Sequence, residues 1–310
     1  MGALKIPAED IDIILNRIIP HIKQHIADQS AKPTKRPFVL ALTGLQGSGK
    51  STWTDALAGT LRSKHNYKTI NISLDDLYLD HDDLVRLRRS NPSNKLLQAR
   101  GQPGTHDTAL SVSFFRSLMD SREISVPSFD KSLFNGEGGR APSHKWKRII
   151  TSDIDVVIFE GWCVGFQPLA KERVMSRWNE AGKATCRSAY PTDTLKEHAI
   201  EHLLGVNESL AQYCEMFMGP DHFDYLVHLD TDDLVNVYEW RMEQEHALRQ
   251  YKGAGMTDEE VIKFVKGYMP AYELYLDQLR KGIFPDAKGK EQLRVVVDKG
   301  RNIIAMETVA

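Results

Sequence analysis

The sequence from residue 44 to residue 52 is Gly44-Leu45-Gln46-Gly47-Ser48-Gly49-Lys50-Ser51-Thr52. It fits the pattern G-x-x-x-x-G-K-[ST] of a phosphate-binding loop. Residues 38–43 before it are an apolar run of strand length, and residues 53–61 after it read as a helix with Leu57 and Leu61 on one face. A strand, a glycine loop and a helix in this order are the setting in which the motif binds phosphate. The stretch therefore predicts a nucleotide site in an α/β fold.

The residue types of the loop suit this chemistry. Gly44, Gly47 and Gly49 are expected to allow unusual φ values and to bring backbone N–H groups close to phosphate oxygens. The helix that starts near Lys50 directs the positive end of its dipole at the same anion. We expect Lys50 to reach the β- and γ-phosphates and the Ser51 hydroxyl to bind Mg²⁺.

Composition places the chain among ordinary globular proteins. The 310 residues are 41% hydrophobic and 26% charged, with a net charge of −2, which gives no overall attraction to nucleic acid or to an acidic membrane. Cys163, Cys186 and Cys214 are far apart and odd in number, so they indicate a reducing compartment rather than a disulfide framework. The oligomeric state cannot be read from the sequence.

Targeting signals are not expected. No apolar run approaches the roughly 20 residues that span a bilayer. Glu9, Asp10 and Asp12 argue against secretory and organellar leaders, and Ile6 stands where a myristoylation signal has Ser or Thr. We expect a cytoplasmic protein, with the nucleus as a further compartment left open.

Strand and helix patterns alternate along the chain. The predicted strands cover residues 38–43, 69–73, 155–161, 225–230 and 293–297. The predicted helices cover residues 8–29, 53–61, 108–120, most of 165–220, 231–250 and 257–281. The segments expected to be irregular are the connector 30–37, the charged stretch 80–107 and the glycine-rich loop 125–144. This order predicts a parallel sheet with helices on both faces and ligands at the carboxyl ends of the strands. We expect residues 1–37 to pack as a helix and connector on a single domain, 38–310.

Asp75 directly follows the second predicted strand. From there it could face the γ-phosphate and accept a proton from an acceptor hydroxyl, as phosphoryl transfer requires. The alternative is a capping or turn acid, because Asp75-Asp76 before a periodic stretch is also good capping chemistry. Spacing alone does not decide between the two.

Glu160 ends the apolar strand 155–161, which would place it beside the phosphate loop as a ligand of Mg²⁺, directly or through water. The alternative is a solvated acid at a strand end.

Arg241 and Arg249 lie on the polar predicted helix 231–250. A mobile helix that carries arginines can close over a nucleotide and neutralise the transferring phosphoryl group. The alternative is ordinary surface chemistry, because Glu245 is spaced i,i+4 from both arginines.

Several segments together resemble a known family. They are the phosphate loop, Ser73-Leu74-Asp75-Asp76-Leu77-Tyr78, Arg100-Gly101-Gln102-Pro103-Gly104-Thr105-His106-Asp107, Phe129-Asp130-Lys131 with Arg140, Glu160-Gly161-Trp162 with Gly165-Phe166, and Trp240-Arg241 with Gln244-Glu245. In these the chain resembles the glycerate kinase family, in particular its fungal branch of ATP-dependent small-molecule kinases, which is related to phosphoribulokinase, uridine kinase and pantothenate kinase. The resemblance runs from about residue 38 to residue 301. Leu77 departs from it, standing where relatives often have Phe.

The resemblance implies a P-loop NTPase fold with a helical lid, ATP and Mg²⁺ as cofactors, and a hydroxyl compound as phosphate acceptor. It implies Asp75 as the catalytic carboxylate, Glu160 as the acid near Mg²⁺, and Arg241 as the lid arginine with Arg249 as the second candidate. The acceptor site that it implies consists of Asp76, Tyr78, Arg100, His106, Asp107, Asp130, Lys131 and Arg140. D-glycerate is the leading acceptor, since cationic side chains could bind its carboxylate.

Other functions remain open at this stage. The acceptor could be a nucleoside, a pantothenate-like acid or a sugar phosphate, because related folds phosphorylate unrelated compounds. The chain could instead be an ATP-binding regulatory protein without transfer activity. A GTPase-like switch is disfavoured, because Asn94-Lys95 is followed by Leu96-Leu97 rather than by the guanine-reading Asn-Lys-x-Asp pattern.

Overall fold

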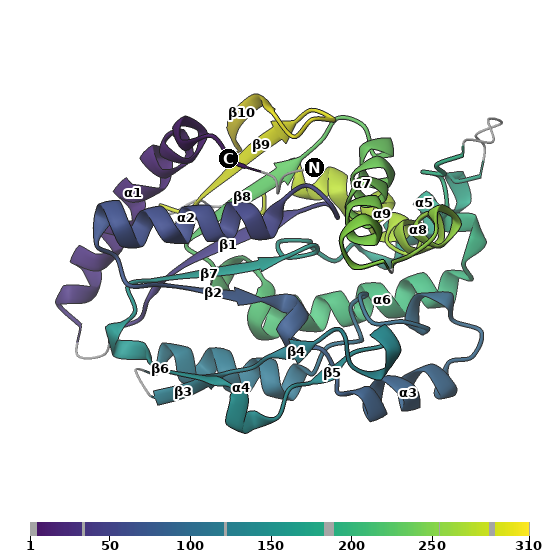
Figure 1. Ribbon diagram of the computed structural model, residues 1–310, viewed down its shortest axis with the longest axis horizontal. Coiled ribbons are helices and arrows are strands. Elements are labelled where there is room, and N and C mark those ends of the chain that lie inside the picture. Colours follow the sequence, from purple (N-terminus) through teal and green to yellow (C-terminus); the bar gives the residue numbers. More distant parts are fainter. Residues whose placement is uncertain are drawn as a thin grey trace.

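The computed structural model describes residues 5–32, 35–120, 123–182, 189–253, 255–284 and 289–309 (Figure 1). Its centre is a six-stranded sheet in the order β10 (Ile303–Val309), β9 (Glu291–Val297), β8 (Tyr225–Asp230), β1 (Phe38–Gly44), β7 (Val156–Gly161) and β2 (Thr69–Ser73). All neighbours pair in parallel except β10, which runs antiparallel to β9. The mostly parallel α/β fold is thus confirmed.

Helices cover both faces of this sheet (Figure 1). One face carries α1 (Ala8–Ser30) and α2 (Lys50–His65), and the other carries α4 (Thr108–Met119), α6 (Ile200–Tyr213) and α9 (Met269–Leu279). On the second face the ring of Phe115 in α4 packs against Phe159 in β7. A strand that is covered by helices on both faces has no face exposed to solvent, so its residues do not alternate between apolar and polar. Accordingly, β1 and β8 are buried along their whole length.

Helix α1 packs on the body through one apolar face. Ile14, Leu15, Ile18 and Ile22 are buried, as the spacing of isoleucines in the sequence predicts. Its His25 ring lies against Phe38 of β1, and α1 also contacts α2. The domain boundary at residue 37 stays a prediction.

The structure corrects the predictions for the charged stretch 80–107 and for 125–144. Residues His81–Ser90 form α3, whose Asp80 cap accepts a hydrogen bond from the N–H of His81. The glycine-rich region 125–144 contains a small antiparallel sheet of β4 (Phe129–Asp130) with β5 (Gly139–Arg140). A second small antiparallel sheet, of β3 (Glu123–Val126) with β6 (Lys147–Ile150), flanks this region.

The C-terminal helices also differ from expectation. The polar helix is α7 (Val235–Lys252), whereas the region predicted as one helix over 257–281 is divided into α8 (Asp258–Lys266) and α9. Figure 1 shows α7 and α8, here called the lid helices, at the side of the sheet toward which the parallel strands run. The remaining long helix is α5 (Lys171–Glu180). Within the described ranges, none of the helices is both long and apolar enough to cross a membrane.

Candidate active site

The loop between β1 and α2 turns sharply at two glycines. Gly47 has φ +81° and Gly49 has φ +93°, values that other residues rarely adopt. The N–H of Ser48 donates to the carbonyl oxygen of Leu45 at 3.2 Å, which closes the turn. The first N–H groups of α2 have no acceptor within the helix, so the loop and the helix end together form an anion site.

Gly44 requires a different explanation from the one expected. Its φ is not in the left-handed region, so conformational freedom is not the reason for glycine here. A Cβ at this position would lie 2.9 Å from the Cβ of Leu229 in β8 and 2.9 Å from the Oγ of Ser48. Glycine is needed because the loop and β8 approach closely.

Lys50 is the first residue of α2, at the end of the loop. Its Nζ donates to the carbonyl oxygen of Leu45 at 3.1 Å. Burial lowers the pKa of Lys50, and the nearby carboxylates of Glu160 and Asp75 act in the opposite direction. A phosphate group bound to the loop would add negative charge beside this ammonium and stabilise its charged form.

Asp75 lies just past β2, in a short 3₁₀ turn. The side chain of Ser73 caps this turn by accepting from the Asp75 N–H, so the Asp75 carboxylate is not the capping group. That carboxylate accepts hydrogen bonds from the Tyr78 hydroxyl at 2.9 Å and from Lys131 Nζ. Burial raises the pKa of Asp75, but the charge of Lys131 and the two hydrogen bonds outweigh it, so the pKa lies below its ordinary value. The group is ionised at neutral pH.

Glu160 ends β7, and its Oε1 accepts from the Ser73 hydroxyl at 2.7 Å. Burial raises the pKa of Glu160, opposed by the charge of Lys50 and by this hydrogen bond. In the described part of the chain, no three His, Cys, Asp or Glu residues are grouped as a metal site. Mg²⁺ typically uses one or two carboxylates together with substrate phosphates and water, so Glu160 with the exposed Ser51 hydroxyl fits this ion.

Arg241 of α7 lies at the same opening. It pairs with Glu245, which is only 4% exposed, and its guanidinium lies 4.7 Å from the ring centroid of Phe264 in α8. Arg249 instead pairs with Asp258 at 2.6 Å. Of the two lid arginines considered from the sequence, Arg241 lines the cleft and Arg249 does not.

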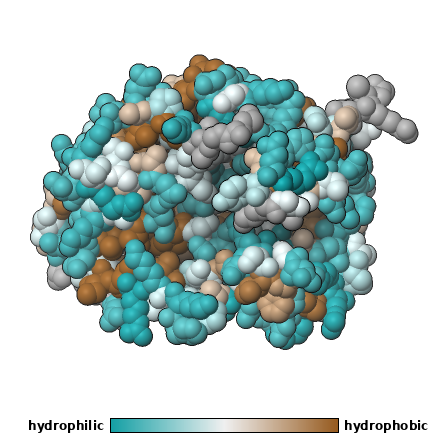
Figure 2. All heavy atoms as spheres, in the orientation of Figure 1, coloured by the Kyte–Doolittle hydropathy of each residue, from teal (hydrophilic) through white to brown (hydrophobic). Residues whose placement is uncertain are grey.

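These groups surround one cleft of about 1220 Å³. Figure 2 shows the molecule hollowed between the part that carries the lid helices and the part that carries α3. The predicted site residues that line the cleft are Gln46, Gly47, Gly49, Lys50, Ser51, Thr52, Asp75, Tyr78, Arg100, Lys131, Glu160 and Arg241. Of the loop residues, Gly44, Leu45 and Ser48 lie behind this surface.

The predicted acceptor residues fall into two groups. Tyr78, Arg100 and Lys131 line the cleft. Arg100 is already bonded there, since its Nη1 donates to the carbonyl oxygens of Gly136 at 2.7 Å and Glu137 at 2.6 Å. It therefore holds the loop after β4 in place.

The other predicted acceptor residues do not line the cleft; they are Asp76, His106, Asp107, Asp130 and Arg140. Asp107 accepts from the N–H of Leu110 at the start of α4 and binds Arg140 at 2.7 Å. Asp76 accepts from the N–H of Phe129 at 3.0 Å, and Asp130 accepts from Ser132 within its own turn. These hydrogen bonds hold the segments behind the cleft in place, and the residues that make them do not lie on its surface.

His106 supports Tyr78 from behind. Its ring stacks on the Tyr78 ring with centroids 4.4 Å apart, and its Nδ1 lies 3.1 Å from the Tyr213 hydroxyl. Burial lowers the pKa of His106 to about 4, so the ring is neutral at pH 7. His106 therefore packs behind Tyr78, away from the surface of the cleft.

The structure adds cleft residues that the sequence did not single out. Arg88 on α3 and Tyr268 before α9 both line the cleft, as does Phe264. Tyr272 of α9 accepts a hydrogen bond from the N–H of Gln46 at 3.1 Å and so holds the phosphate loop. The sequence did carry a signal for α3, the helix on which Arg88 lies. Acidic residues in its first turn and basic residues in its last turn are typical of a helix.

A glycine loop between the first parallel strand and its helix, beside acids at the ends of two neighbouring strands, defines a P-loop protein. A Schizosaccharomyces pombe protein described as "Uncharacterized kinase mug58" is 37% identical over 303 residues, which cover 96% of this chain and 99% of that protein. The "Probable ATP-dependent kinase TDA10" of Saccharomyces cerevisiae is 32% identical over 305 residues, 95% of this chain and 96% of that protein. No family model matches the chain.

Among solved structures, D-glycerate 3-kinase from Cryptococcus neoformans matches with a TM-score of 0.83 and 32% sequence identity. The match covers 99% of this chain and 100% of that one. With about a third of its residues shared over nearly the whole length, the chain belongs to the glycerate kinase family of P-loop kinases.

Proposed function

We propose that the protein transfers the γ-phosphoryl group of ATP to a hydroxyl group of a small molecule, with D-glycerate as the leading acceptor. The observation that carries the proposal is the ionised Asp75 carboxylate, which shares one cleft with the phosphate loop, Lys50 and Glu160. Phosphoryl transfer depends on positioning and charge stabilisation, and these groups would supply both.

The phosphate loop would hold the triphosphate. The N–H groups at the start of α2 and the Lys50 ammonium would contact the β- and γ-phosphates. Bound by Ser51 and Glu160, Mg²⁺ would neutralise charge on the phosphate oxygens. Arg241 would offset the charge that develops on the transferring group.

Asp75 would orient the acceptor hydroxyl and take its proton as the acceptor oxygen forms a bond to the γ-phosphorus. The bond from the γ-phosphorus to the bridging oxygen breaks, and ADP leaves with that electron pair. The low pKa of Asp75 makes it a weak base, so orientation of the hydroxyl comes first and the proton moves late.

D-glycerate is favoured for two reasons. The Cryptococcus neoformans protein that matches along the whole chain is a D-glycerate 3-kinase. The cleft also carries Arg88, Arg100 and Lys131, and a carboxylate acceptor requires a cation.

A panel of acceptors tests the proposal. D-glycerate, L-glycerate, pantothenate, uridine and a sugar phosphate would each be incubated with the protein, ATP and Mg²⁺, with ADP release and product mass as readouts. We expect phosphorylation of D-glycerate above all others. Transfer to another member would reassign the acceptor, and nucleotide binding without any transfer would favour a regulatory ATP-binding protein.

The variant Asp75→Asn tests the proposed role of Asp75 in the mechanism. The amide cannot accept the proton, so kcat should fall by about a hundredfold or more, while the dissociation constant for ATP changes little. Isothermal titration with a non-hydrolysable ATP analogue measures the second quantity. A variant that keeps wild-type turnover would remove Asp75 from the mechanism.

A further inference from the structure

Arg301 connects the last hairpin of the sheet to the phosphate loop. It lies in the turn between β9 and β10, and its Nε donates to the carbonyl oxygen of Gly47 at 2.8 Å. Its side chain is 9% exposed. The turn is held by its own bonds, since the N–H of Arg301 donates to the Asp298 carbonyl at 2.9 Å and the N–H of Asp298 donates to the Asn302 carbonyl at 3.0 Å.

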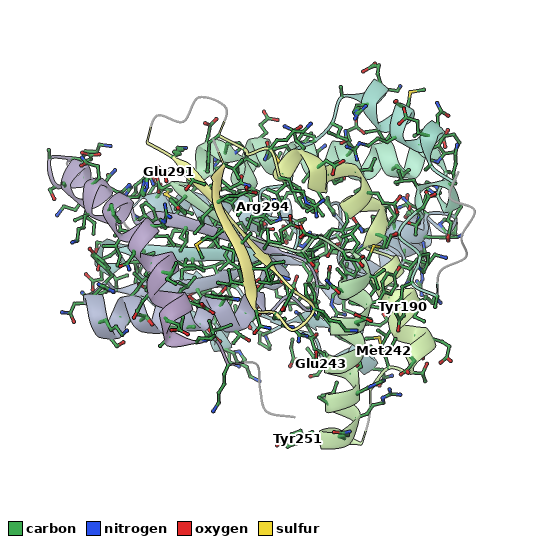
Figure 3. The ribbon with its side chains drawn as sticks, turned by 90° about the horizontal axis from the view of Figure 1, so that it is seen from above. Tyr190, Met242, Glu243, Tyr251, Glu291 and Arg294 are labelled. Atoms are coloured by element: carbon green, nitrogen blue, oxygen red, sulfur yellow. The ribbon has the colours of Figure 1, made fainter. Side chains whose placement is uncertain are left out.

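The same guanidinium also binds the first lid helix. Its Nη1 lies 2.7 Å from Oε2 of Glu243 in α7, and its Cζ lies 5.6 Å from the centroid of the Trp240 ring. Figure 3 shows the β9–β10 hairpin with its turn beside the part of α7 that carries Glu243. One side chain from the β9–β10 turn thus contacts two segments that are far from it in the sequence, the phosphate loop and α7.

The backbone of Arg301 supports a specific role. Its φ is +66°, which is uncommon for a residue with a long side chain. Such conformations persist where the surroundings hold them, and they gather at functional sites. Here the left-handed conformation occurs at the residue whose side chain reaches Gly47.

The contact fixes one peptide of the phosphate loop. The peptide between Gly47 and Ser48 has its carbonyl bonded to Arg301 and its N–H bonded to the Leu45 carbonyl. A carbonyl oxygen that turned toward the anion site would repel phosphate, so a donor that holds this oxygen elsewhere keeps the loop ready to bind. Arg301 itself does not line the cleft.

We propose that Arg301 is a positioning residue that holds the Gly47 carbonyl away from the phosphate site and ties the phosphate loop to α7 through Glu243. The proposal rests on the proposed function only in that the loop binds nucleotide phosphates. Its effect is on phosphate affinity, and it does not involve contact with the nucleoside.

The test compares Arg301→Met with Lys299→Met. Lys299 is a matched control, because it lies in the same turn and pairs with Glu239 of the same helix at 2.8 Å but contacts no phosphate-loop residue through its side chain. Two probes are titrated calorimetrically with Mg²⁺ present: a non-hydrolysable ATP analogue and inorganic tripolyphosphate, which has no nucleoside. We expect Arg301→Met to lower the affinity for both probes by about tenfold, and Lys299→Met to lower neither affinity by more than about twofold.

Kinetics supply a second readout. In Arg301→Met the KM for ATP should rise while the KM for the acceptor stays the same, and the melting temperature without ligand should fall only slightly. If Arg301→Met does not fold, Arg301→Gln and Arg301→Lys carry the same test, and Lys should recover part of the affinity through Glu243.

Four results would overturn the inference. The first is that Arg301→Met leaves the affinity for both probes unchanged, and the second is that it weakens binding of the nucleotide analogue alone, which would mean contact with the nucleoside. The third is that Lys299→Met loses as much affinity as Arg301→Met. The fourth is that the wild type binds neither probe. Only the last of these also overturns the proposed function.

Discussion

The glycines of the phosphate loop and of the helix that follows it differ sharply in how much stability an added side chain would cost. A Cβ on Gly47 would lie 2.5 Å from the Cβ of Trp240, and the residue has a positive φ. By contrast, a Cβ on Gly59 within α2 would meet nothing within 4 Å. Gly47→Ala should therefore lower the free energy of unfolding by about 2 kcal/mol and impair nucleotide binding, because strain and overlap add.

Gly59→Ala is the matched control and should raise the free energy of unfolding by about 0.5–1 kcal/mol, since alanine restricts the unfolded chain and suits a helix interior. Urea unfolding of both variants, with nucleotide titration, checks the pair. A Gly47→Ala protein as stable as Gly59→Ala would show that α7 can move away from the loop at little cost.

Single residues also show how much of the site could be predicted from the sequence. The motif identified the phosphate loop, because its glycines and lysine follow from local backbone chemistry. It could not explain Gly44, whose reason is a contact with Leu229 far along the chain. Nor could it separate Tyr78, which lines the cleft, from His106, which stacks behind it, because both lie in motifs of the same family.

At the scale of elements, a buried carboxylate on α7 holds the segment just before α8. Glu245 of α7 binds Arg241 and also accepts from the N–H of Met256, just before α8, at 3.1 Å. If Arg241 stabilises the transferring group, Glu245→Gln should lower kcat about fivefold, because a neutral amide holds the guanidinium less firmly. The KM for ATP should change by less than about twofold.

Glu259→Gln, at an exposed position in the first turn of α8, is the control for this variant. Steady-state kinetics of both proteins with ATP and the acceptor give the comparison. A kcat at or above wild type in Glu245→Gln would show that Glu245 competes with phosphate for Arg241.

Elements that the sequence predicted correctly are those with long apolar patterns, such as β1, β7, β8 and α1. Helix α3 was missed because it is short and mostly charged, with Leu84, Val85 and Leu87 as its apolar residues and none of its ten residues buried. Strand β10 was missed for a similar reason, since it is an edge strand whose residues are partly or fully exposed. Its position is decided by pairing with β9, which is a tertiary contact.

For the whole molecule, buried histidines predict a loss of stability in acid. Burial lowers the pKa of His106, His198 and His228 to about 4 from an ordinary value of 6.5. Below pH 6.5 the unfolded chain binds protons at these sites and the native protein does not, so the free energy of unfolding falls as pH drops from 6.5 toward 4. Burial raises the pKa of Glu273 to about 7, and this group acts in the opposite direction between pH 7 and 4.5.

His228→Leu tests this dependence. Both ring nitrogens of His228 are buried without a hydrogen-bond partner, so an apolar side chain should cost little at pH 7. Between pH 6.5 and 5 the variant should lose stability less steeply than the wild type, by up to about 1.4 kcal/mol per pH unit. Urea unfolding at a series of pH values measures the slope, with exposed His144→Leu as the control. Equal slopes in His228→Leu and wild type would contradict the assignment.

The absence of a side chain at Gly47 has a mechanical consequence. Because a Cβ at position 47 would overlap Trp240 and crowd the N–H of Arg241, the loop and the beginning of α7 cannot come closer together. The bonds of Arg301 to Gly47 and to Glu243 also resist their separation. We therefore expect the beginning of α7 to move together with the phosphate loop, and the cleft to open through the later part of α7 and through α8.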